Sequence, residues 1–133
     1  MAHHKLHLEL ADSLITDMRS SRDGSEWPVM VDAGYYAVFH AMEALNATEC
    51  RNSHSFADAG EILDTMLARQ FLEEAFIDQY YFLFYFRRGT LYGAHTPTKE
   101  QLDRYVEVAE QSYRRVTAIF ADMARRYGLE RGA

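Results

Sequence analysis

The chain has 133 residues, of which 48% are apolar and 26% charged, with only 7 glycines and 2 prolines. This composition excludes a disordered, collagen-like or low-complexity protein, and the length predicts that residues 1–133 form one domain. The net charge of −6 argues against a protein that coats nucleic acid regardless of sequence, because such binding depends on positive charge.

The first part of the chain predicts two helices separated by a turn. Residues 4–20 place apolar side chains three and four positions apart, the period of an amphipathic helix that ends near Ser20. This expected buried stripe consists of Leu6, Leu10, Leu14 (or Ala11) and Met18. Asp23 and Gly24 then supply turn residues. Residues 28–47 are apolar almost all round, which predicts a central helix.

A third helix is expected from Asn52 or Ser53 to Leu67. Residues 71–92 contain the run YYFLFYF, which propensity alone would assign to a strand. Helical spacing and the absence of a partner strand favour a helix instead, with a buried face of Leu72, Phe76, Tyr80 (or Gln79), Leu83 and Phe86 (or Arg87). Gly89 and Gly93 are expected to loosen its C-terminal end.

The last helix has the clearest signal, because Thr98 and Gln101 form a capping-box pattern in front of it. An apolar stripe follows, and Gly128 is expected to stop the helix. The stripe comprises Leu102, Tyr105, Val106, Ala109, Tyr113, Val116, Phe120, Met123 and Tyr127. Five helical segments joined by short loops predict an all-α fold, an antiparallel up-and-down bundle of four to five helices.

The cysteine count and the hydropathy bear on the compartment. The single cysteine, Cys50, excludes an internal disulfide and a CxxC zinc site, and it indicates a reducing, cytoplasmic environment. No apolar run reaches the roughly 18 residues of a membrane helix, so no membrane partner is expected.

We expect no metal and no other cofactor. His3 and His7 share a helical face but lack an evident third ligand, which favours a solvated N-terminus. His40 is read as a hydrogen-bonded core residue and His54 as a capping or packing residue.

Four residues near the end of the aromatic segment are candidates for chemistry. Metal-free RNA cleavage needs a base of near-neutral pKa and a fixed cation for the phosphorane, which are roles for His and Arg. Arg88 and His95 would share one face about 10 Å apart if the helix continued through them. Arg87 and Tyr92 complete the set. The alternative is that both arginines favour a helix C-terminus and that His95 is a loop residue.

Three segments together resemble the HEPN family (higher eukaryote and prokaryote nucleotide-binding domain). They are residues 27–45 with the stretch YYAVFHA, residues 51–56 (RNSHSF), and residues 86–93 (FRRGTLYG) followed by a capped C-terminal helix. The resemblance implies an up-and-down bundle that forms a homodimer around a shared cleft. It also implies a metal-independent ribonuclease, or the toxin of a toxin–antitoxin pair whose antitoxin is a minimal nucleotidyltransferase.

The family signature is an arginine followed by four to six residues and then a histidine. Arg87 matches the family arginine, and the family histidine falls on Tyr92, where this chain departs from the pattern. Arg88 and His95, with six residues between them, meet the loosest form of the spacing. Besides the ribonuclease, two other functions remain open: an inactive module that binds a nucleotide or a nucleotidyltransferase partner, and a structural dimer that pairs through its aromatic helix.

Overall fold

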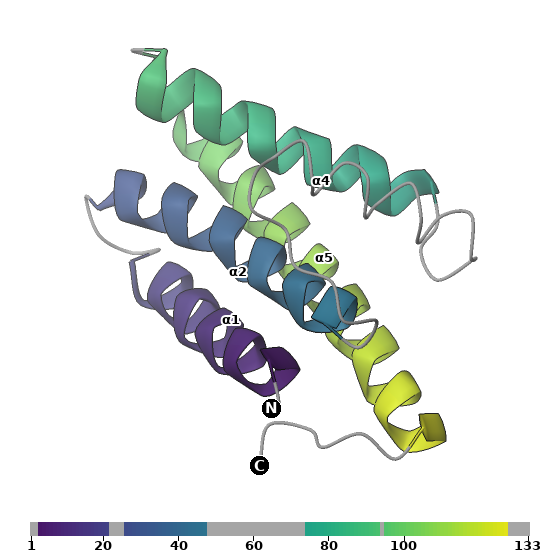
Figure 1. The fold of residues 1–133 in the computed structure, drawn as a ribbon. Coiled ribbons are helices and arrows are strands. Elements are labelled where there is room, and N and C mark those ends of the chain that lie inside the picture. Colours follow the sequence, from purple (N-terminus) through teal and green to yellow (C-terminus); the bar gives the residue numbers. More distant parts are fainter. Residues whose placement is uncertain (1–2, 22–25, 48–73, 94, 128–133) are drawn as a thin grey trace.

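A computed structural model describes residues 3–21, 26–47, 74–93 and 95–127 (Figure 1). These residues form α1 (His3–Ser20), α2 (Trp27–Ala47), α4 (Glu74–Arg87), the π-helical turn η1 (Arg88–Tyr92) and α5 (Lys99–Tyr127), and none of them belongs to a strand. The predicted all-α class and four of the predicted helices are therefore confirmed. The predicted helix from Asn52 or Ser53 to Leu67 lies outside the described residues, as do Asp23, Gly24, Cys50, His54 and Gly128.

Helix α2 occupies the centre of the bundle, as its apolar composition predicts. It contacts α1, α4 and α5, while α5 also packs against α4. Figure 1 shows successive described helices running in alternating directions, with α1 and α4 on either side of α2. The side chains of Val31, Val38 and Leu45 are almost completely buried along α2. The up-and-down arrangement is therefore confirmed for these helices.

The buried face of α1 differs from the predicted stripe. Leu6 and Leu10 are 54% and 40% exposed, which contradicts the prediction for these two residues. The side chains that face the core are those of Leu8, Ala11, Ile15 and Met18, which also follow a helical period. Leucines at positions 6, 8 and 10 make both faces apolar at the start of the helix, and packing against α2 selects between them.

The aromatic segment is helical from Glu74 on, and the described part of its inner face matches the prediction, while Leu72 lies outside the described residues. Phe76, Tyr80 and Leu83 are buried at successive turns of α4. The hydroxyl of Tyr80 lies 2.6 Å from that of Tyr35, so the two buried phenols share a hydrogen bond between α4 and α2. This pairing of apolar rings and satisfied hydroxyls explains why tyrosines serve as core residues here.

The start of α5 carries the predicted capping box. The backbone N–H of Thr98 donates to Oε1 of Gln101 at 2.9 Å, and the N–H of Gln101 donates to Oγ1 of Thr98 at 3.1 Å. Further along, the Tyr105 hydroxyl donates to the carbonyl of Val31 at 2.5 Å. A Cβ on Gly34 would lie 3.0 Å from the Tyr105 ring, so α2 and α5 approach closely at this glycine. None of the described helices combines the length and apolar character that a membrane span requires.

Candidate functional site

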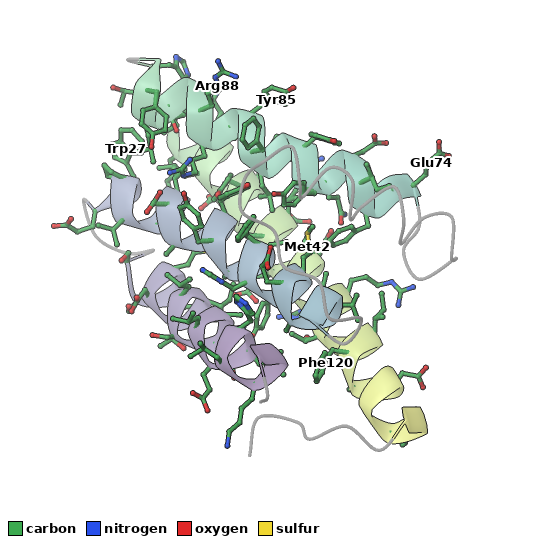
Figure 2. The ribbon with its side chains drawn as sticks, in the orientation of Figure 1. Trp27, Met42, Glu74, Tyr85, Arg88 and Phe120 are labelled. Carbon is green, nitrogen blue, oxygen red and sulfur yellow. The ribbon has the colours of Figure 1, made fainter. Side chains whose placement is uncertain are left out.

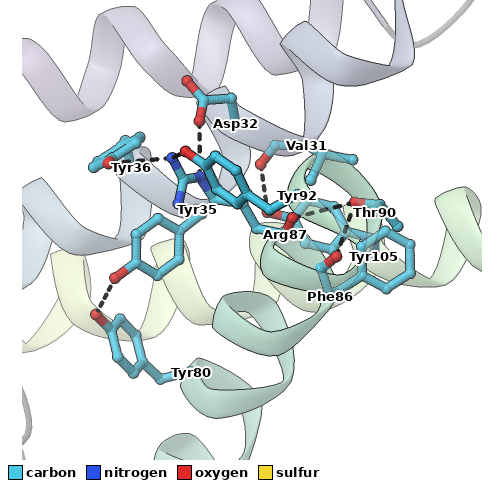
Figure 3. A network of polar contacts seen from close by, with 10 residues as sticks. All are labelled: Val31, Asp32, Tyr35, Tyr36, Tyr80, Phe86, Arg87, Thr90, Tyr92 and Tyr105. Carbon is cyan, nitrogen blue, oxygen red and sulfur yellow. Dashed lines mark hydrogen bonds and ion pairs between the residues drawn. The ribbon is translucent and has the colours of Figure 1, made fainter. Parts of the chain in front are cut away.

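Helix α4 does not stop before Gly89 but continues through it as the π-helical turn η1, which ends before Gly93. In an α-helix, residues five positions apart point about 140° away from each other, because each residue turns the chain by about 100°. The i→i+5 hydrogen bonding of a π turn widens the turn and brings such residues to one side. Tyr92 therefore lies beside Arg87, whose Nη2 donates to the Tyr92 hydroxyl at 3.1 Å (Figure 3).

Gly93 closes this turn by close backbone contact. A Cβ at Gly93 would lie 2.5 Å from the carbonyl oxygen of Gly89, whereas a Cβ at Gly89 would meet nothing within 4 Å. The expected loosening at these glycines is therefore a change of helical pitch, and only Gly93 is required to be a glycine by its surroundings.

The guanidinium of Arg87 is enclosed by side chains of α2 and η1. Its Nε donates to Oδ1 of Asp32 at 2.8 Å, and its Nη2 also donates to the Tyr36 hydroxyl at 3.3 Å. It also lies over the rings of Tyr35, Tyr36 and Tyr92, at 5.4, 4.8 and 5.3 Å from their centroids. Figure 3 shows these groups converging on the cation from both elements.

Arg87 keeps its positive charge, and the neighbouring Asp32 carboxylate balances that charge. Its side chain is 13% exposed, whereas that of Asp32 is 48% exposed. Burial works against the charge, but the hydrogen bond to Asp32 and the nearby Tyr36 outweigh it and raise the pKa of Arg87 above its ordinary value. A phosphate approaching Arg87 would have to compete with the Asp32 carboxylate for the same cation.

Arg88 and His95 are not brought together. The helix ends at Tyr92, so the shared face predicted for a continuous helix is not present. Within the described part of the chain, Arg88 is exposed and its side chain makes no hydrogen bond or ion pair. His95 is also exposed, and its Nε2 lies 3.4 Å from Oε1 of Gln101.

The sequence therefore identified Arg87 and Tyr92 but missed Asp32 and the two tyrosines of α2 as their partners. One signal was available. Asp32 and Glu43 are the only Asp, Glu, Lys or Arg residues in the otherwise apolar segment 27–47. An acid on a central helix needs a cationic or hydrogen-bonding partner.

A second polar cluster joins α1 and α2. Nδ1 of His7 lies 3.1 Å from Nδ1 of His40, and Nε2 of His7 lies 4.0 Å from Oε2 of the buried Glu43. The expectation of a solvated His7 is thus wrong, while His40 is hydrogen-bonded as predicted. Burial, and then the neighbouring His7, lower the pKa of His40. No group of three or more His, Cys, Asp or Glu among the described residues has the arrangement to hold a metal ion.

An open groove of about 470 Å³ lies between α4 and the start of α5. Its apolar side is formed by Phe82 and Phe86, and its polar side includes Gln101 and Arg104. Because Gln101 also contacts His95, this groove adjoins the loop that carries the predicted histidine.

No family model matches this chain, and no curated protein is similar enough to count as a relative.

Proposed function

We propose that this chain is a HEPN-like helical module that acts by binding and does not cleave RNA. The resemblance of its sequence and the alternating helices of its bundle support the HEPN-like assignment. The observation that carries the absence of cleavage is the closed contact of Arg87 with Asp32 and Tyr92.

The chemistry of RNA cleavage explains why this contact matters. Attack by a 2′-hydroxyl requires a base whose pKa is near neutral and a cation free to face the phosphorane. A tyrosine, with an ordinary pKa near 10, is a poor base at neutral pH. The described residues in contact with Arg87 include no histidine, and Asp32 already neutralises its charge.

The test is an RNA cleavage assay in EDTA with analysis of the product ends. The wild-type chain is expected to leave RNA intact. Tyr92→His restores the histidine of the family signature next to Arg87, and Tyr92→Phe is its matched control. Metal-free products ending in 2′,3′-cyclic phosphate from the wild type would refute the proposal. Loss of those products in Arg88→Ala or His95→Ala would then assign the cleavage activity to Arg88 and His95.

The partner implied by the resemblance is a minimal nucleotidyltransferase. If such a protein is encoded beside this chain, the two are expected to elute together after co-expression. In a toxin–antitoxin pair, this chain alone would arrest growth and the nucleotidyltransferase would relieve the arrest. Growth without arrest, together with a stable complex, would support a binding module without toxicity.

A nucleotide is a second candidate ligand, favoured by the groove between α4 and α5. Phe82 and Phe86 offer apolar ring surface for a base, while Arg104 offers a cation for a phosphate. Isothermal titration with ATP is expected to show binding that Arg104→Ala weakens. Arg114→Ala is the matched control, because Arg114 is an exposed arginine of the same helix that does not line this groove. Equal ATP affinity in both variants would exclude this groove as the site.

A further inference from the structure

The start of α1 has little apolar surface with which to hold on to the bundle. Figure 2 shows α1 at the edge of the bundle, with side chains filling the space between it and α2. Of residues 5–10, Leu8 is the one buried apolar residue, and the leucines two positions before and after it are exposed. His7 adds a polar contact with His40 of α2. The attachment of these first turns therefore depends strongly on that contact.

The second half of α1 is held more firmly. Ala11, Ile15 and Met18 are at most 2% exposed and face the core. Near the end of the helix, Nε of Arg19 donates to Oε1 of Glu110 in α5 at 2.7 Å. The start of α1 can therefore separate from α2 while its second half stays in place, as a local opening of the fold.

The contact between His7 and His40 depends on how many protons the two rings carry. Their Nδ1 atoms lie 3.1 Å apart, and the rings stack with 5.4 Å between their centroids. A ring nitrogen donates when it carries a proton and accepts when it does not. The hydrogen bond thus forms while one of the two Nδ1 atoms is protonated and the other is not. When both are protonated, two donors and two positive charges face each other.

The surroundings determine which nitrogen stays without a proton. Oε2 of the buried Glu43 lies 4.0 Å from Nε2 of His7, so its carboxylate favours a proton on His7. Burial, and then the neighbouring His7, lower the pKa of His40. Nδ1 of His40 is therefore the acceptor near neutral pH, and it gains its own proton only in acid.

Other ionisable groups face this region from each neighbouring element. Tyr36 lies one turn before His40 on α2, and Tyr80 of α4 interacts with the carboxylate of the cluster. Tyr113 of α5 contacts Asp12 of α1. Burial raises the pKa of Tyr80 and of Tyr113, so these two phenols stay neutral where histidines titrate. The histidines are therefore the groups whose charge changes in mild acid.

We propose that the contact between His7 and His40 is a pH switch, which holds the start of α1 on α2 while one of the facing nitrogens lacks a proton and releases it when both are protonated. In the released form both rings reach water, where a histidine titrates near pH 6.5. The closed form is therefore favoured above that pH and is lost as the pH falls through the lower pKa of His40 in the closed form.

The switch adjoins the candidate site. The ring of His40 lies 6.4 Å from that of Tyr36, measured between centroids, and the Tyr36 hydroxyl accepts a hydrogen bond from Nη2 of Arg87 at 3.3 Å. The side of α2 that the release uncovers is thus one turn from a residue that holds Arg87. This inference goes beyond the proposed function, because it holds whether or not the chain binds a partner or cleaves RNA.

The test is amide hydrogen exchange followed by NMR at about pH 7.5 and about pH 5, with rates converted into protection factors to remove the intrinsic effect of pH. At the lower pH, the amides of residues 7–11 should lose protection at least about tenfold, and those of residues 15–20 less than about threefold. In His7→Gln and in His40→Gln, protection of residues 7–11 should change less than about threefold, because a glutamine amide can donate or accept. The exposed His95 gives the matched control, and His95→Gln should keep the wild-type loss.

His3 and His4 require a control of their own, because they belong to the first turn of α1 and histidines titrate in the same pH range. The double variant His3→Gln, His4→Gln should keep the loss of protection at residues 7–11. A loss that disappears in this variant would overturn the assignment to His7 and His40.

Three other results would overturn the inference. They are unchanged protection of residues 7–11 in the wild type, an equal loss along the whole of α1, and a loss that persists in both His7→Gln and His40→Gln. Far-UV circular dichroism checks that each variant keeps its helices. NMR titration of the wild-type His40 ring needs no variant: a midpoint below pH 6.5 is expected, and a midpoint at or above it would also overturn the inference.

Discussion

Removal of the Asp32 carboxylate should destabilise the fold more than removal of its partner Arg87. Asp32→Ala leaves a cation that is 13% exposed and that, among the described residues, keeps only tyrosine hydroxyls and rings around it. Arg87→Met leaves an acid that is 48% exposed and reaches water. A buried charge without its counter-ion costs about 3–5 kcal/mol. Because this pair is only partly buried, we expect about 2 kcal/mol for Asp32→Ala and about 1 kcal/mol for Arg87→Met.

Urea unfolding followed by far-UV circular dichroism measures both values. All variants are compared at one protein concentration, because association would make the apparent stability depend on concentration. The double variant should show a coupling free energy of about 1 kcal/mol between the two sites. Asp17→Ala, which removes an exposed acid without an ion pair in the described residues, should stay within about 0.5 kcal/mol of the wild type. Equal effects of the two single variants, or no coupling, would refute the reasoning.

Three further predictions concern stability. Gly93→Ala should lower the stability by about 1–3 kcal/mol, since the added Cβ meets the backbone of Gly89. Gly89→Ala adds a Cβ in open space and should be neutral or stabilising by up to about 1 kcal/mol. Thermal unfolding of the two variants beside the wild type measures both effects. The lowered pKa of His40 contributes stability above pH 6.5, and this stability is lost as the pH falls through the folded-state pKa. The urea midpoint of His40→Gln should therefore depend less on pH between about 7.5 and 5.5 than that of the wild type. Tyr80→Phe deprives the buried Tyr35 hydroxyl of its 2.6 Å partner and should cost about 1–2 kcal/mol in urea, and wild-type stability would contradict this.

The helices could be predicted because their signals are local. The capping box before α5 and the spacing of Phe76, Tyr80 and Leu83 lie within a few residues of the structure that they specify. The face of α1 could not be predicted in the same way, because apolar residues at Leu6 and Leu8 fit two stripes. The packing of α1 against α2 selects between the two stripes, and this packing is a tertiary contact that local sequence does not specify.

The candidate site was predicted in part for the same reason. The cation Arg87 was identified, but its counter-ion Asp32 lies 55 positions earlier in the chain. No local spacing rule connects the two. The proximity of Tyr92 to Arg87 depends on the π turn, and a helix of ordinary pitch would have placed the tyrosine on another side.

The π turn also determines where α4 tolerates a change in chain length. With one residue fewer between Arg87 and Tyr92, ordinary α-helical winding would place the tyrosine four positions after the arginine, where side chains again share a face. A deletion of one residue within residues 88–91 would thus preserve the pair, whereas the same change earlier in α4 would rotate one part of its core face by about 100° relative to the rest. A sequence motif that requires a fixed number of residues between Arg87 and Tyr92 would overlook chains with the same geometry. When such chains are aligned with this one, the gap should be placed within this turn.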